Sequence, residues 1–247
     1  MFLRLVQHLV KTEYIVDMSA TYEREILSGL RRTQGCVFAS LLQNVNDPGE
    51  CVSLTIWESQ RAASLYEESG LFPVLLKSLR PYFIESNDWE LKLSDDLSIE
   101  YTPIPTDPSI KGFDEQTEKE GIQKFYTTPY AAKIITLTVQ PEKIQEFQDI
   151  FVSKLMPKFK SQKGFIHIIL LRKSNEFNII SFWDETIDLN SPMGESNLDV
   201  FSRSIFEVLP STVQWQVSHK ASRTNYAASD EIKASVYRCL TGEWFLK

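Results

Sequence analysis

The fold is decided by residues 10–30, VKTEYIVDMSATYEREILSGL, which return 129 positions later as residues 139–159, VQPEKIQEFQDIFVSKLMPKF. In both stretches a strand end leads into a helix, because Thr12 suits a helix cap and Pro141 suits a first helical turn. Apolar residues recur at spacings of three and four, which predicts one buried face on each helix. They are Ile15, Met18, Tyr22, Ile26 and Leu30 in the first copy and Ile144, Phe147, Phe151, Leu155 and Phe159 in the second. Gly35 and Gly164 follow as left-handed helix ends.

The remaining elements of the two copies also match in order and length. A hairpin is expected from residues 36–42 and 52–57, and again from residues 165–171 and 178–183. A second helix places Glu68-Ser69-x-Leu71 over Glu195-Ser196-x-Leu198, and a closing strand carries Trp89 in one copy and Trp215 in the other. Matching elements in the same order predict two diverged copies of one βαββαβ unit.

We therefore divide the chain into a first copy (residues 1–97), a Pro-containing linker (98–130), a second copy (131–220) and a C-terminal tail (221–247). One short polar helix is expected at residues 114–124, and the tail is expected to pack on the body. A βαββαβ unit forms a four-stranded antiparallel sheet with both helices on one face, so its other face needs a cover. The predicted fold class is α+β, with two ferredoxin-like units whose sheets pack as an intrachain pseudo-dimeric barrel.

The composition indicates a globular protein without a polyanion-binding surface. The chain is 43% hydrophobic and 24% charged, with a net charge of −7 and a pI near 5.1, which argues against nucleic-acid binding. No apolar run reaches the roughly 18–20 residues of a membrane span, and the start lacks the pattern of a signal peptide, so we expect a cytoplasmic location. The expected hairpin register places Cys36 opposite Ser59 rather than Cys51, which predicts free thiols.

Three short motifs carry a resemblance to a known family: Gly35-Cys36, Trp57-Glu58-Ser59 and Ser69-Gly70-Leu71-Phe72. Together they resemble the antibiotic biosynthesis monooxygenase (ABM) domain of dimeric α+β barrels, over roughly residues 1–93 and more weakly over 131–220. The resemblance implies that the two copies supply both protomers of such a barrel, with a pocket between sheet and helices in each. It also implies a choice among cofactor-free oxygenases that convert phenolic or anthrone-type aromatics to quinones, haem-degrading enzymes, and members without known activity.

The motif positions of these branches are only partly filled. In the quinone-forming branch, the residue at the Trp57 position works with an Asn four residues earlier, where this chain has Ser53. In the haem-degrading branch, a Trp and a His stand where this chain has Tyr66 and Leu76, and the lost imidazole argues against haem degradation. The second copy matches neither branch, since Trp183 is accompanied by Ile179, Pro192 and Ser202.

His8 is the most informative single residue. By the two-residue period of a strand it lies in the helix-facing row Val6, His8, Val10, where the second copy has Ile135, Leu137, Val139. His8 is either a general base toward a phenolic proton or a core histidine hydrogen-bonded to Tyr66, Tyr22 or a carbonyl. Trp57 and Trp183 either stack on an aromatic ligand or serve as core residues, and Tyr66 either lines the pocket or reaches solvent. The predicted catalytic residues are His8, Trp57 and Tyr66, and the predicted substrate-binding residues are Ser53, Tyr22, Phe38, Leu76, His167 and Trp183.

No cluster of His, Cys or acidic residues has metal-ligand spacing, and the chain lacks a glycine-rich phosphate loop and a GxSxG elbow. We therefore expect no metal and no cofactor. The expected partner is a small apolar or aromatic ligand, not nucleic acid or a membrane, and the fusion of two copies favours a monomer. The predicted function is cofactor-independent monooxygenation of a small phenol- or anthrone-type aromatic. The alternative is a non-catalytic, small-ligand-binding or stress-associated barrel protein.

Overall fold

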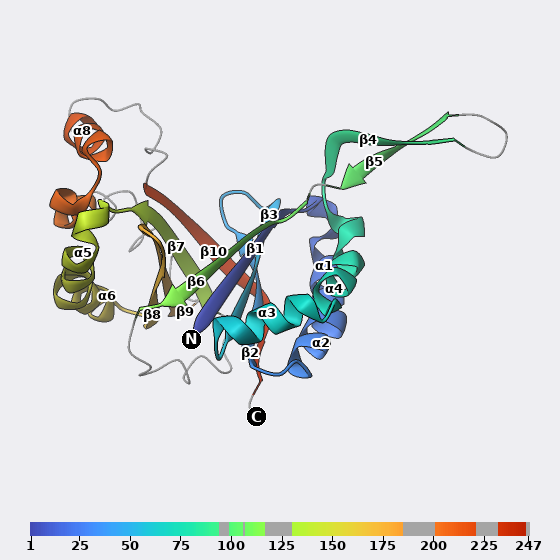
Figure 1. Cartoon of the computed structure of the whole chain (residues 1–247), viewed down its shortest axis with the longest axis horizontal. Coiled ribbons are helices and arrows are strands. Elements are labelled where there is room, and N and C mark those ends of the chain that lie inside the picture. Colours follow the sequence, from blue (N-terminus) through green and yellow to red (C-terminus); the bar gives the residue numbers. More distant parts are fainter. Residues whose placement is uncertain (94–98, 106, 117–129, 185–200, 221–231, 246–247) are drawn as a thin grey trace. The chain divides into compact units, whose positions relative to one another are not determined.

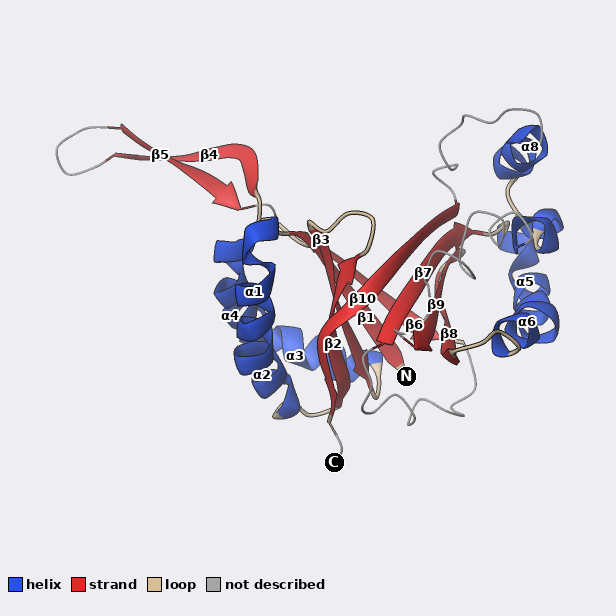
Figure 2. Cartoon of the chain, turned by 180° about the vertical axis from the view of Figure 1, so that it is seen from behind, coloured by secondary structure: helices blue, strands red, loops and turns tan. Residues whose placement is uncertain are grey.

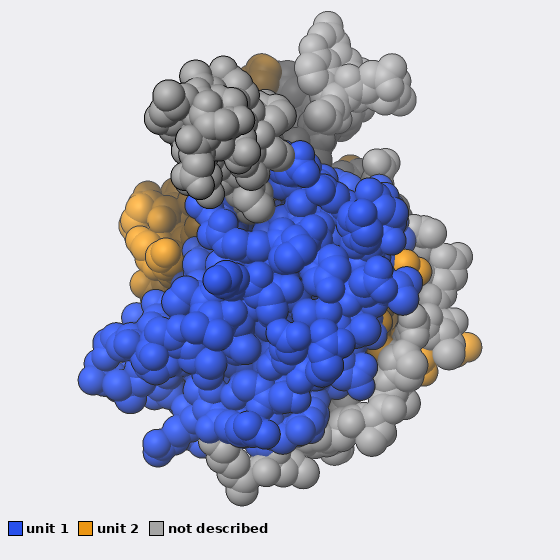
Figure 3. Space-filling model, turned by 90° about the vertical axis from the view of Figure 1, so that its right-hand side faces the viewer, with its two compact units in different colours: residues 1–112, 240–247 blue, residues 113–239 orange. Residues whose placement is uncertain are grey.

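The computed structural model describes residues 1–93, 99–105, 107–116, 130–184, 201–220 and 232–245. It has two compact units: unit 1 comprises residues 1–112 and 240–247, and unit 2 comprises residues 113–239 (Figure 3). The chain passes from unit 1 to unit 2 within strand β6 (Ser109–Glu115) and returns within strand β10 (Ile232–Trp244). No helix among the described residues is long and apolar enough to cross a bilayer.

Unit 1 is built on an antiparallel sheet with the strand order β1-β3-β2. The strands are β1 (Phe2–Leu9), β2 (Cys36–Asn44) and β3 (Glu50–Trp57). The helices α1 (Ile15–Thr21), α2 (Ser28–Arg31), α3 (Gln60–Glu68) and α4 (Leu71–Leu79) lie on one face of this sheet (Figures 1 and 2). A π-helical turn, Tyr22–Leu27, joins α1 to α2. Short 3₁₀ turns stand at Thr12–Tyr14 and Arg80–Tyr82.

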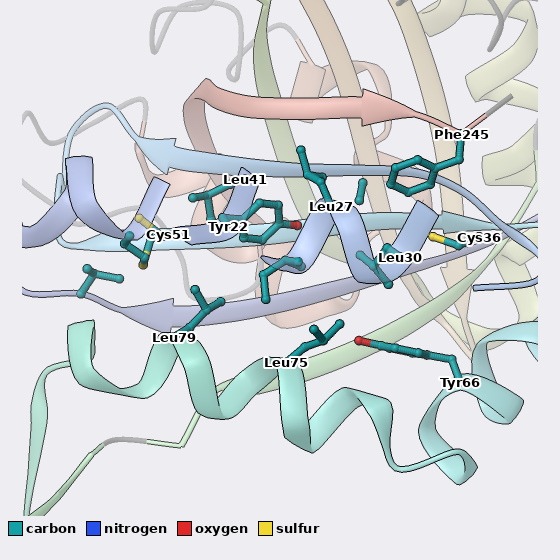
Figure 4. Close-up of a cluster of buried hydrophobic side chains, with 14 of the residues drawn as sticks. Tyr22, Leu27, Leu30, Cys36, Leu41, Cys51, Tyr66, Leu75, Leu79 and Phe245 are labelled. Carbon is teal, nitrogen blue, oxygen red and sulfur yellow. The ribbon is translucent and has the colours of Figure 1, made fainter. Parts of the chain in front are cut away.

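The core of unit 1 lies between the sheet and these helices. The spacing of three and four on the first helix places Met18, Tyr22 and Leu30 against the sheet, and all three are fully buried. From α3 and α4, Tyr66, Leu75 and Leu79 meet the same cluster (Figure 4). The helix face predicted from the sequence is therefore the face that packs.

Unit 2 repeats this plan with the strand order β7-β9-β8. Its strands are β7 (Tyr130–Thr138), β8 (Phe165–Lys173) and β9 (Glu176–Asp184), and its first helices are α5 (Ile144–Ile150) and α6 (Met156–Lys160). A π-helical turn, Phe151–Leu155, again joins the two helices, 129 positions after its counterpart begins at Tyr22. Further 3₁₀ turns stand at Pro141–Lys143 and Phe206–Val208. The repeat predicted from the sequence thus extends to an irregular backbone feature.

Several sequence predictions are confirmed in detail. Gly35 and Gly164 have φ values of 79° and 73°, in the left-handed region that favours glycine, but the helices end earlier than predicted, at Arg31 and Lys160, so each glycine lies in the turn before the next strand. Cys36 lies opposite Trp57, two residues from the predicted partner, because the hairpin register is one residue off (Leu41 opposite Ser53) and a bulge between Cys36 and Phe38 shifts it by one more. Cys36 and Cys51 form no disulfide, as expected.

The closing strands differ from prediction. Trp215 lies in helix α8 (Ser211–Lys220) and is 63% exposed, so the prediction of a closing strand at this position is wrong. Its backbone enters a helix directly after a proline, with the amide of Gln214 donating to the carbonyl of Pro210 at 2.9 Å. Trp89 does lie in a strand, β4 (Glu85–Leu93), but β4 pairs with β5 (Ile99–Pro105) in a separate two-stranded sheet that projects from unit 1 (Figure 1).

The predicted linker and tail also contain sheet strands. Asp114 and Glu115, expected at the start of a polar helix, belong to β6 and pair with β8. The amide of Gln116 donates to the carbonyl of Leu170 in β8 at 2.8 Å, so this residue is not helical either. Residues 117–124 of the expected helix lie outside the described residues, as do Pro192 and the segment Glu195–Leu198. The tail forms β10, whose residues Ile232 to Arg238 pair with β7 in unit 2. Its end packs in unit 1, where the amide of Phe245 donates to the carbonyl of Val37 at 2.8 Å.

Candidate functional site

A pocket in unit 1 lies between the sheet and the helices, with a volume of ≈ 40 Å³. Its lining comes from β1, β3, the π-helical turn, α2, α3 and α4. The lining residues are Arg4, Val6, His8, Tyr22, Ile26, Leu30, Ser53, Thr55, Tyr66, Phe72, Leu75, Leu76 and Leu79. About 150 Å³ is needed to hold benzene, so an aromatic ligand requires side chains to move. Phe72 and Leu76 are the half-buried apolar residues of the lining, which makes them the side chains best placed to move.

Strand β1 contributes Arg4, Val6 and His8 to the pocket, because alternate residues of a strand point to the same face. The predicted helix-facing row is therefore confirmed for Val6 and His8. Arg4 extends the same row by one further step toward the N-terminus, and the sequence interpretation missed it.

His8 is a neutral imidazole inside the pocket wall. It is 4% exposed, its ring stacks on Phe83 with centroids 5.0 Å apart, and neither ring nitrogen has a hydrogen-bond partner among the described residues. Burial lowers the pKa of His8 to about 4, a shift that the nearby Val6 backbone opposes only weakly. His8 is thus buried against Phe83, as a core histidine would be, and it forms no hydrogen bond to Tyr66 or Tyr22.

Arg4 is the one charged side chain that lines this pocket. It is 3% exposed, and its guanidinium carbon lies 4.1 Å from the centroid of the Phe72 ring and 5.8 Å from that of Tyr66. The carboxylate of Glu67 lies 3.1 Å from Nη1, but the angle does not make a hydrogen bond. Burial lowers the pKa of Arg4, and Glu67 opposes that shift.

The hydroxyl groups of Tyr22 and Ser53 join the helical layer to the sheet. Their oxygens are 2.7 Å apart, and the Tyr22 hydroxyl also donates to the carbonyl of Ser40 at 3.3 Å. Tyr22 opens the π-helical turn, a backbone irregularity that is frequent at functional sites. The predicted ligand-binding residues Tyr22 and Ser53 therefore meet in one place, together with His8 on the adjacent strand.

Trp57 lies behind the pocket rather than in its lining. It is fully buried, its indole Nε1 donates to Thr55 Oγ1 at 2.9 Å, and its ring lies 5.0 Å from that of Tyr66. Tyr66 does line the pocket, and burial raises the pKa of its hydroxyl well above the ordinary value. Trp57 thus supports a pocket residue that stays protonated and able to donate a hydrogen bond.

The other predicted site residues divide between the two units. Leu76 lines the unit 1 pocket, whereas Phe38 packs against Trp244 with ring centroids 4.7 Å apart. His167 and Trp183 belong to unit 2. Burial, together with Lys160, lowers the pKa of His167 to about 4, and Trp183 Nε1 donates to Ser181 Oγ at 2.9 Å.

Among the described residues of unit 2, the positions equivalent to the polar pocket groups carry apolar side chains. Where unit 1 has His8, Tyr22 and Ser53, the repeat places Leu137, Phe151 and Ile179, and all three are fully buried in the unit 2 core. The cation is retained, because Lys133 stands at the Arg4 position and is 4% exposed, with its pKa lowered to about 8 by burial. The polar ligand-facing groups are thus a property of unit 1, whereas a buried cation is common to both units.

Residues 131–190 match the family model described as antibiotic biosynthesis monooxygenase. This match confirms the resemblance inferred from the sequence and places it in unit 2, although the quoted motifs lie in the first copy. A comparison with curated proteins gives no match.

Solved structures match over the whole chain. A candidate monooxygenase from Fusobacterium nucleatum has 14% identity and a TM-score of 0.60, with 98% of this chain and 94% of that chain covered. A candidate monooxygenase from Lactobacillus acidophilus has 7% identity and a TM-score of 0.57, covering 99% and 96%. An anthrone oxidase-like protein has 10% identity and a TM-score of 0.52, covering 100% and 94%. At these identities the likeness confirms the fold, a tandem of two ferredoxin-like α+β units in one chain.

Proposed function

On the premise that unit 2 is an antibiotic biosynthesis monooxygenase domain and unit 1 its diverged repeat, we propose that the chain is a cofactor-independent monooxygenase. Its site is the unit 1 pocket, and its substrate is a small aromatic with a ring hydroxyl. The observation that carries the proposal is the placement of a neutral, buried imidazole, His8, in one pocket with hydroxyl groups of Tyr22, Ser53 and Tyr66.

The chemistry follows from what each group is able to do. The free ring nitrogen of His8 accepts the phenolic proton, and the electron-rich anion passes one electron to O₂. The substrate radical and superoxide then combine at a ring carbon that carries hydrogen. Cleavage of the O–O bond, with loss of that hydrogen, leaves one oxygen atom as a quinone carbonyl and releases the other as water. The substrate supplies all the electrons, and the proton held by His8 leaves in the water.

The hydroxyl groups and the apolar lining have separate roles in this reaction. Tyr66 is a donor for the oxyanion that forms on the substrate, and Ser53 becomes a second donor when Tyr22 gives its own proton to Ser53 instead of to the Ser40 carbonyl. The leucines around them exclude water, which strengthens each of those interactions. Trp57 acts as a positioning residue through Tyr66.

One observation favours a second candidate function, non-catalytic binding of a small ligand. A base whose pKa is lowered to about 4 takes up a phenolic proton poorly unless the pocket also stabilises the resulting anion. A binding protein needs no such base.

Oxygen uptake tests the proposal. The purified chain is assayed against anthrones, hydroquinones and catechols, alongside His8→Leu, which copies the residue that unit 2 carries at this position. Trp57→Phe and the matched unit 2 variant Trp183→Phe separate an effect on the pocket from a general loss of packing. We expect catalysed uptake that His8→Leu abolishes and that Trp57→Phe lowers more than Trp183→Phe. Uptake no faster than the uncatalysed rate across the panel would support the binding function instead.

A further inference from the structure

The strongest unexplained feature of the unit 1 pocket is its buried guanidinium. Nε, Nη1 and Nη2 of Arg4 are all buried and lack a hydrogen-bond partner among the described residues. A buried charge without hydrogen bonds is costly, and a buried arginine in proteins is normally held by a carboxylate or phosphate in a two-pronged arrangement. Arg4 therefore has unused donors in a pocket whose other lining residues carry no formal charge.

We propose that Arg4 binds the ligand of this pocket as an oxyanion, so that the ligand is a small aromatic compound carrying a carboxylate or a ring hydroxyl that ionises once it is bound. The inference rests on the proposed function only in taking the unit 1 pocket as the ligand site. The Phe72 ring centroid lies 4.1 Å from the guanidinium carbon, and that of Tyr66 lies 5.8 Å from it. An aromatic ring among the leucines would then present its oxygen atoms to the free donors of Arg4.

Glu67 acts in this arrangement as the resident counterion. Its carboxylate is 3.1 Å from Nη1, yet its side chain is 53% exposed and makes no hydrogen bond to Arg4. An incoming oxyanion with better geometry therefore displaces Glu67 into water at little cost, since a half-exposed ion pair contributes little stability. Glu67 competes with the ligand, so its removal should strengthen binding.

The internal repeat supports a role for the cation beyond local packing. Lys133 occupies the Arg4 position in unit 2, although the pocket residues around it are replaced by apolar ones. In both units the backbone carbonyl of this cation accepts a weak hydrogen bond, from Thr55 at 3.4 Å and from Ser181 at 3.5 Å. The same hydroxyl groups accept the indole N–H of Trp57 and Trp183. In both units the same hydrogen-bond network thus holds the backbone of the cation, whereas the polar pocket that surrounds the cation is found in unit 1.

Binding of 4-nitrophenol measures oxyanion stabilisation without any turnover. At a pH near the pKa of the free compound, the wild-type chain should increase the visible absorbance of 4-nitrophenolate. Arg4→Met should weaken phenolate binding by about tenfold to a hundredfold, the effect of one buried charged hydrogen bond. Glu67→Gln should tighten it. Arg61→Gln is the matched control, because Arg61 also pairs with a glutamate, Glu68, but is 70% exposed and outside the pocket.

A second arm distinguishes the source of the oxyanion. Benzoate and benzyl alcohol, which share a ring and differ in charge, are compared as competitors of 4-nitrophenol in the same variants. Preference for benzoate in the wild type, lost in Arg4→Met, indicates carboxylate recognition, and binding of 4-nitrophenolate alone indicates a ring hydroxyl. Three outcomes would overturn the proposal. They are equal binding of benzoate and benzyl alcohol without a preference for phenolate, an unchanged affinity of Arg4→Met for 4-nitrophenolate, and no binding of any probe. Arg4-dependent binding without oxygen uptake would remove the monooxygenase function and leave this inference standing.

Discussion

Replacement of Arg4 by Met should stabilise unit 1 against unfolding. Arg4 is 3% exposed and has no hydrogen-bonded partner among the described residues, so folding removes its charge from water with little compensation. Methionine has a similar length and no charge, and it fills the same space beside Phe72. A protein that retains a buried charge of this kind sacrifices stability for a function.

The magnitude follows from two opposing contributions. Replacement of a whole buried ion pair by apolar side chains is neutral or stabilising by about 1–4 kcal/mol, and the lower part of that range applies here because only Arg4 is replaced and Glu67, 53% exposed, stays in water. The contact of Arg4 with Phe72, at 4.1 Å, is lost in the variant, and such contacts contribute about 0.5–2 kcal/mol. The net expectation is a gain of about 1 kcal/mol in the free energy of unfolding, which moves the urea midpoint upward by roughly 0.5 M for a domain of this size.

Urea unfolding followed by circular dichroism measures this change, with Arg61→Met as the control. Arg61 is 70% exposed, and an exposed substitution of this kind changes stability by less than about 0.5 kcal/mol. A loss of 1 kcal/mol or more in Arg4→Met, with the control unchanged, would refute the reasoning. Such a loss would mean that Glu67 and the two rings satisfy the guanidinium, and the argument for free donors would fail with it.

Three further outcomes test the structure independently. The His8→Leu chain should lose less stability on acidification than the wild type. The pKa of His8 is about 4 in the folded chain and 6.5 in the unfolded chain, so between these values only the unfolded wild-type chain takes up the proton. Urea unfolding at about pH 7.5 and pH 5 should show that the wild type loses about 2 kcal/mol more than the variant. Gly35→Ala should destabilise far more than Gly70→Ala in thermal melts: both have positive φ, but an added Cβ at Gly35 would lie 2.5 Å from Ala62 Cβ, whereas at Gly70 nothing lies within 4 Å. Trp57→Phe and Trp183→Phe should each cost about 2 kcal/mol in urea unfolding, since each loses packing and a buried N–H···O bond, and equal losses would show that the duplicated network carries the same energy in both units.

The elements that the sequence predicted correctly depend on local patterns. The helix faces follow from spacings of three and four over 21 residues, and the hairpins from strands separated by short turns. Gly35 and Gly164 identified the turns between helix and strand because the left-handed conformation is a single-residue property. These features need no knowledge of distant contacts, which is why the repeat alone was enough to predict them.

The errors occur where a strand pairs with a distant part of the chain. Val213, Trp215 and Val217 alternate like a strand, yet the turn after Pro210 starts a helix there. The strand beside β7 is supplied by the tail instead, with Ile232 opposite Leu137. An apolar segment identifies a strand only when its pairing partner is known, and nothing local to the tail specifies that partner.

Arg4 was missed for a different reason. A charged residue near a chain end is usually solvated. The predicted helix-facing row therefore began at Val6 and did not include Arg4, two residues earlier on the same strand face. The repeat contained the missing signal, because the shift of 129 that aligns the helices also aligns Arg4 with Lys133. Two cations at one inward-facing strand position, 129 residues apart, indicate burial of charge in both copies.

A comparison of the two units shows which polar groups of the site occur together and which occur separately. Unit 2 keeps the cation, the hydroxyl and the tryptophan (Lys133, Ser181 and Trp183), but it lacks the histidine and the tyrosine–serine pair. At those positions its described core has buried apolar side chains. The cation and tryptophan network thus occurs in both units, whereas His8, Tyr22 and Ser53 occur together only in the unit 1 pocket among the described residues. In the proposed function that second group performs the chemistry, and in the proposed binding mode Arg4 holds the oxyanion of the ligand.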